Sequence, residues 1–156
     1  FEKSLELAKR KSDNFSIARS YGGLGEVEYE EGNVVGAKKY YQLCLKVCEN
    51  LEKPKAIAST LISIAHCDIT TDNFPEANNN LIRAIKLSQS HNYAKGEREA
   101  TQMLAWNFHQ IGDFSNAEPL LRIIVHLHKE ADLELPKWFV ENGYIDQDDV
   151  WDYPKQ

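Results

Sequence analysis

Three similar turns recur along this chain: Gly32-Asn33-Val34-Val35-Gly36-Ala37, Asp72-Asn73-Phe74-Pro75-Glu76-Ala77 and Gly112-Asp113-Phe114-Ser115-Asn116-Ala117. Their alanines stand at positions 37, 77 and 117, so the turns are separated by 40 residues each time. A fixed period in this range is typical of stacked repeats, in which each unit buries its apolar face against the next. The three turns therefore predict an all-α fold, an α-solenoid of antiparallel helix pairs.

Apolar residues at helical spacing on both sides of the turns support this prediction. We expect helices over about 1–10 and 16–31, and after the three turns over about 34–51, 74–90 and 115–131. The residues of 16–31 expected to face inward are Ile17, Ala18, Tyr21, Leu24, Gly25 and Val27. Small residues recur at the same period, which predicts close contact between paired helices at Gly25, Ala65 and Ala105.

Each turn needs a residue that tolerates a positive φ angle, and this place is held by Gly32, Asp72 and Gly112. The residue that follows is expected to bond the backbone of the next helix; these residues are Asn33, Asn73 and Asp113. In the last helix we expect Ser115 to be the N-cap and Glu118 to complete a capping box, with Pro119 at the edge of the first turn.

The register divides the chain into a repeat array over 1–134 and a C-terminal region over 135–156. The array begins with a half repeat at 1–13 and continues with full repeats at about 14–53, 54–93 and 94–134. In the C-terminal region, 135–140 is expected to form a helix that caps the last hairpin, followed by an acidic, aromatic tail at 146–153. Because the first repeat is only half present, we expect the chain to be part of a longer protein.

Composition limits the class of partner. The formal net charge of −6 argues against nucleic acid, since phosphate binding needs a basic surface. No run of apolar residues is long enough to span a membrane. Three cysteines without framework spacing favour a reducing, cytoplasmic location.

The repeated residues resemble the tetratricopeptide repeat (TPR) family. The first full repeat matches that pattern at Tyr21, Leu24, Gly25, Tyr29, Gly32, Asn33, Ala37 and Tyr41. The third matches at Asp113, Phe114 and Ala117, and the second more loosely at Leu61, Ala65, Phe74, Ala77 and Leu81. The period of 40 differs from the usual 34 and is similar to the arrays of bacterial signal-transduction ATPases, transcription regulators and some scaffold proteins. The resemblance implies a right-handed superhelix whose first helices line a concave groove.

By this resemblance the function is a non-catalytic protein-interaction scaffold that holds a peptide or helix in the groove. The residues expected to line it are Arg19, Glu26, Tyr29, Glu30, Ile62, His66, Ile69, Glu99, Gln102, Trp106, His109 and Gln110, with Gly22, Ser59 and Thr70 on the same face. One TPR subfamily binds the acidic tails of chaperones through a cationic clamp, but the matching places here are Gly22, Glu26, Ser63, Glu99 and Met103. A basic or amphipathic partner is expected instead.

An enzyme or a metal site is not expected, and neither is a cofactor. His66 and Cys67 are adjacent and diverge by about 100° on a helix. Cys44 and Cys48 share a face, but Cys44 stands where Ala84 and Ile124 stand in the other repeats, as a core residue does. His66, His109 and Glu30 form a combination that could hold zinc if all three face the groove, although a structural role is expected for each.

An alternative function also fits the resemblance. The chain would then be the sensor or regulatory TPR segment of a larger signal-transduction ATPase or transcription regulator, and would contact its own chain. The exposed terminal repeat also offers a surface for self-association.

Overall fold

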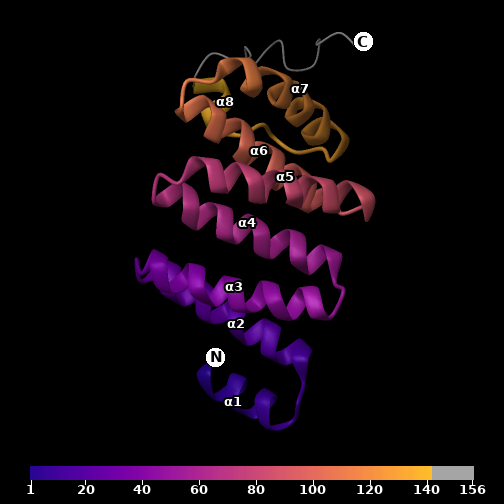
Figure 1. Ribbon diagram of the computed structural model, residues 1–156. Helices are drawn as coiled ribbons and strands as arrows, with labels where there is room; N and C mark the ends of the chain where they lie inside the picture. Colours follow the sequence, from indigo (N-terminus) through magenta and orange to yellow (C-terminus); the bar gives the residue numbers. More distant parts are fainter. Residues whose placement is uncertain (142–156) are drawn as a thin grey trace.

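The structure, a computed structural model, describes residues 1–141, and these form helices joined by short turns (Figure 1). The tail predicted at 146–153 lies outside the described residues. In chain order the helices are α1 (Glu2–Arg10), α2 (Asn14–Glu30), α3 (Val34–Asn50), α4 (Pro54–Thr70), α5 (Phe74–Ser90), α6 (Ala94–Gln110), α7 (Phe114–Glu130) and α8 (Lys137–Glu141). None of the helices within 1–141 is long and apolar enough to cross a membrane.

The helices stack in chain order from α1 to α7, and each packs against the next (Figure 1). α4 also packs against α6, so the first helices of neighbouring pairs touch. The molecule is therefore an α-solenoid of antiparallel helix pairs, which confirms the fold class predicted from the repeated turns. The pairs α2–α3, α4–α5 and α6–α7 follow the half repeat that contains α1.

The backbone repeats at half the period seen in the sequence. Helices α2 to α7 each contain 17 residues and begin every 20 residues, from Asn14 to Phe114. A positive φ occurs in every turn, at Ser12, Gly32, Glu52, Asp72, Asn92, Gly112 and Asp132. The amide after this residue returns to the carbonyl five residues earlier, as from Asn33 to Glu28 at 2.8 Å, which is the Schellman closure of a helix end.

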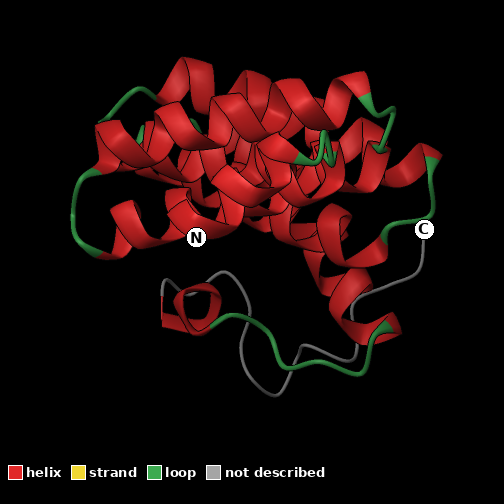
Figure 2. Ribbon diagram, turned by 90° about the horizontal axis from the view of Figure 1, so that it is seen from below, coloured by secondary structure: helices red, strands yellow, loops and turns green. Residues whose placement is uncertain are grey.

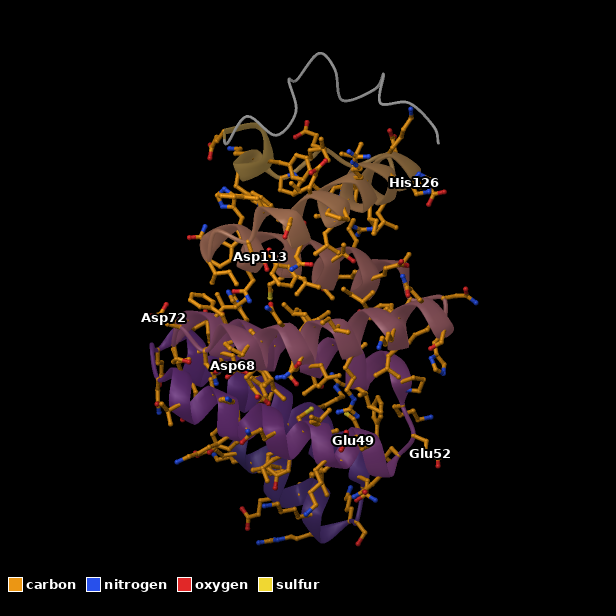
Figure 3. All side chains as sticks on the ribbon, turned by 45° about the horizontal axis from the view of Figure 1, so that its top comes forward. Glu49, Glu52, Asp68, Asp72, Asp113 and His126 are labelled. Atoms are coloured by element: carbon orange, nitrogen blue, oxygen red, sulfur yellow. The ribbon has the colours of Figure 1, made fainter. Side chains whose placement is uncertain are left out.

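The predicted positive φ angles at Gly32, Asp72 and Gly112 are confirmed. The positive φ angles at the other four helix ends were not predicted, because Ser12, Glu52, Asn92 and Asp132 give no glycine signal. Figure 3 shows Glu52 and Asp72 at opposite ends of α4.

The small residues predicted at the helix contacts are buried. Ala37, Ala77 and Ala117 are at most 1% exposed, and Gly25, Ala65 and Ala105 are buried as well. Val27 was predicted to face inward and is instead 38% exposed. It lies two positions beyond Gly25, about 200° around the helix, and so faces away from the contact.

Three predictions about helix starts were wrong. α7 begins one residue earlier than the expected cap, because Asp113 rather than Ser115 is its N-cap and accepts a bond from the Asn116 amide at 3.3 Å. Pro119 consequently lies inside the helix, in its second turn. Asn73 is the N-cap of α5 but makes no side-chain cap bond. Pro75, at the second helical position, has no amide hydrogen, so one of the usual donors to a cap is absent.

After α7 the chain runs through a loop to the short helix α8 (Figure 2). Its Phe139 is fully buried in a cluster with Ala105, Leu121, Ile124 and Val125. α8 thereby covers the apolar face that α6 and α7 present at this end of the stacked pairs.

Candidate binding groove

A pocket with a volume of about 450 Å³ opens between α4, α6 and α8. The residues that line it come from all three helices: Ile62, His66, Ile69, Thr70, Glu99, Gln102, Met103, Trp106 and Trp138. On α4 and α6 these residues are separated by three or four positions, the spacing that places side chains on one face of a helix. The pocket therefore lies where the first helices of the second and third pairs meet.

Six of the twelve predicted groove residues line this pocket: Ile62, His66 and Ile69 from α4, and Glu99, Gln102 and Trp106 from α6. Thr70, which was expected on the same face, lines it as well. Two more of the predicted residues lie next to its lining, since Tyr29 contacts His66 and Thr70, and the His109 ring lies 6.4 Å from the Trp138 ring. The remaining four are on the exposed surface and do not line it: Arg19, Glu26, Glu30 and Gln110.

Two pocket residues were missing from the predicted set. Met103 was considered only as one of the clamp positions, and its place one residue after Gln102 puts it at the edge of the same helix face. Trp138 lies after the periodic part of the chain, so the repeat register could not place it. Its sequence signal was the apolar run 138–140 at the start of the expected capping helix.

The wall of the groove towards α2 is formed by a polar contact between two repeats. The Tyr29 hydroxyl lies 2.8 Å from Thr70 Oγ1 and 3.4 Å from His66 Nε2. The Tyr29 and His66 rings are stacked with centroids 4.9 Å apart. Thr70 also donates to the His66 carbonyl at 2.8 Å, so the positions of these side chains are mutually constrained.

The opposite end of the pocket is aromatic. Trp138 packs against Phe139 with ring centroids 5.4 Å apart, and His109 packs edge-on against Phe114 at 5.5 Å. His109 thus joins α6 to the start of α7 through Phe114 and to α8 through Trp138. Trp106 and Trp138, which are both half-buried, line this end of the pocket.

The pocket is weakly charged. Glu99 is the one carboxylate among its lining residues, and its nearest cation is Lys95 at 3.7 Å. Burial lowers the pKa of His66 from its ordinary value, because desolvation disfavours the charged ring. At neutral pH the imidazole is therefore uncharged, and the lining carries a single negative charge.

Within residues 1–141 no group of three or more His, Cys, Asp or Glu side chains is placed to hold a metal ion. His66, His109 and Glu30 consequently do not form the zinc site that their predicted positions had suggested. Cys44, Cys48 and Cys67 are buried free thiols, as expected of core residues.

The fold and the groove together define a helical-repeat protein of the solenoid class. No family model matches the sequence, and no curated protein matches it. Among solved structures, the chain is similar to that of BtubC (BKLC) from P. vanneervenii, with a TM-score of 0.70 and 20% sequence identity. The match covers 84% of this chain but only 55% of that protein, so this chain spans about half of its length. At this level of identity the similarity shows the fold alone.

Proposed function

We propose that this chain is a non-catalytic protein-interaction scaffold of the TPR type, which holds a peptide or helix in the groove between α4, α6 and α8. The observation that carries the proposal is the pocket itself: five apolar side chains surround it, including Trp106 and Trp138. Large apolar pockets with half-buried aromatic residues are where partner side chains gain most binding energy. The three buried thiols of the described chain fit a reducing compartment such as the cytoplasm.

A segment that binds here would place one large apolar side chain in the pocket and its backbone along α4 and α6. Gln102, whose side-chain amide both donates and accepts, is the lining residue suited to bond that backbone. Such a mode uses a preformed surface, since the helices that carry the lining belong to the packed array.

The test is a peptide-display selection on the complete chain, followed by affinity measurements on the selected peptides with variants. Trp106→Ala should weaken binding at least about tenfold, the usual effect of removing a central aromatic anchor. Ile82→Ala is the matched control, because Ile82 is 38% exposed on α5 and does not line the groove. Peptides whose affinity is equal for both variants and the unmodified chain would place binding elsewhere on the surface.

A further inference from the structure

Building on this proposed function, we propose that the groove selects a partner segment in which a Lys or Arg adjoins the large apolar residue, and that Glu99 binds this cation. The pocket provides the apolar part of this recognition through Ile62, Ile69 and Met103 and the two tryptophans. Glu99 lies on the same helix face, seven residues or about two turns before Trp106. A single partner side chain, or two neighbouring ones, can therefore meet both features.

Glu99 is available to a partner. Its side chain is 46% exposed, and its ion pair with Lys95 is a one-turn surface pair at 3.7 Å with both groups in solvent. Pairs of this kind contribute only a few tenths of a kcal/mol, so a cation on the partner can replace Lys95 at small cost. An anion on the partner would be repelled by Glu99. Lys95 would not offset this repulsion, because it does not line the pocket.

The other surroundings of the pocket favour a positive charge as well. The His66 ring lies 3.4 Å from the uncharged hydroxyl of Tyr29, and its backbone carbonyl accepts a bond from Thr70. The faces of Trp106 and Trp138 attract cations through the ring quadrupole. On α2, the exposed Glu26 lies one helical turn before Tyr29, the residue that contacts His66 and Thr70 at this side of the groove.

The negative charge of Glu99 also distinguishes between possible occupants of the pocket. The segment of this chain at 146–153 carries Asp146, Asp148, Asp149 and Asp152 beside its aromatic residues. Its apolar side chains suit the pocket, but its charge has the same sign as Glu99. The groove is therefore matched to a basic amphipathic partner rather than to this acidic segment.

Three small probes of nearly equal shape test the inference on the complete chain. Tryptamine, tryptophol and indole-3-propionate place an ammonium, a hydroxyl and a carboxylate on the same indole side chain. Their affinities are measured by NMR chemical-shift perturbation of the pocket residues. We expect tryptamine to bind about two- to fivefold more tightly than tryptophol, as one solvent-exposed ion pair allows, and indole-3-propionate to bind most weakly.

Two variants assign the preference to Glu99. Glu99→Gln should remove the preference for tryptamine over tryptophol. Lys95→Met removes the competing cation and should enlarge the preference, which should shrink in 0.5 M salt. Equal binding of the three probes, or a preference that survives Glu99→Gln, would overturn this inference and leave the proposed groove intact. Failure of all three to perturb the pocket residues would overturn the groove as well.

Discussion

The ring of Tyr41 on α3 occupies the space into which a side chain at position 25 of α2 would project. A Cβ placed on Gly25 lies 2.6 Å from Cε1 of Tyr41, closer than real Cβ contacts come. In the next two pairs the same places are held by Ala65 with Leu81 and by Ala105 with Leu121, and all four are buried. Glycine thus stands opposite the aromatic ring and alanine opposite leucine, so the two positions compensate each other in volume.

The first prediction tests this compensation with Gly25→Ala. The substitution improves helix propensity by about 1 kcal/mol but forces the buried Tyr41 ring to move, at a cost of about 1–3 kcal/mol. We expect a net loss of stability, measured by urea unfolding. Gly22→Ala is the control on the same helix, because its added Cβ would make only an ordinary contact, 3.9 Å from Cys44 Sγ. It should be stabilising.

A second background separates sterics from backbone effects. In Tyr41→Leu, which reproduces the size used in the other pairs, Gly25→Ala should become stabilising instead of destabilising. If Gly25→Ala has the same effect in both backgrounds, the two residues are not coupled.

The fold could be predicted from the sequence because its repeated unit is set by small residues and turn residues. Ala37, Ala77 and Ala117 recur at one spacing and are all buried, and the glycines in two of the turns mark helix ends directly. The 20-residue period was not predicted. At the other turns the positive φ is adopted by residues such as Glu52, whose side chain gives no local signal.

The second prediction concerns the central turn. Ala77 is fully buried at the start of α5, where the core leaves no space for a larger side chain. We expect Ala77→Leu to lower the free energy of unfolding by about 1–3 kcal/mol through overpacking. Ala94→Leu is the matched control, since Ala94 begins α6 and is exposed. Equal melting temperatures of the two variants would contradict this packing.

The candidate site was less predictable than the fold. Helix spacing assigned Ile62 of α4 and Trp106 of α6 to the inner faces of their helices, and both line the same pocket. Helix spacing could not predict which of the residues on these inner faces would line a pocket and which would lie on the open surface. Arg19 and Glu26 share the face but line no part of the pocket, whereas Trp138 reaches the pocket from outside the repeats. A pocket forms where several helices meet, here α4, α6 and α8, and the spacing within one helix does not contain this information.

The third prediction concerns a buried ion pair between repeats. Lys38 of α3 donates to the fully buried carboxylate of Asp68 on α4, which also accepts a bond from Asn80 of α5 at 3.3 Å. Lys38→Met leaves this carboxylate without its charged partner. We expect a loss of roughly 2–3 kcal/mol, below the full cost of an unpaired buried charge because Lys38 is partly exposed.

The control for this pair is on the surface. Arg83 and Glu49 form an ion pair at 2.6 Å, and both side chains are exposed. Glu49 lies well away from Asp68 (Figure 3). Arg83→Met should cost less than about 1 kcal/mol in the same unfolding measurement. The double variant Lys38→Met/Asp68→Leu should recover part of the loss, since it removes the buried charge along with its partner. A double variant less stable than Lys38→Met alone would argue against an unpaired charge as the cause.

The last prediction is a loss of stability at alkaline pH. Burial, together with nearby negative groups, raises the pKa of Tyr41 from 10 to about 12 and that of Cys67 from 9 to about 11. The folded state therefore keeps protons that the unfolded chain releases. The stability from each group is complete below its unfolded pKa and is lost as the pH rises through its folded pKa.

The resulting pH windows are 9 to 11 for Cys67 and 10 to 12 for Tyr41. We expect the melting temperature, followed by circular dichroism, to fall across both windows. Tyr41→Phe keeps the ring against Gly25 but removes the hydroxyl, and Cys67→Ala removes the thiol, so each variant should lose less stability than the unmodified chain within its own window. The test rests on the difference between the three unfolding curves rather than on the fall itself. Parallel curves for the three proteins would show that neither proton is held by the fold.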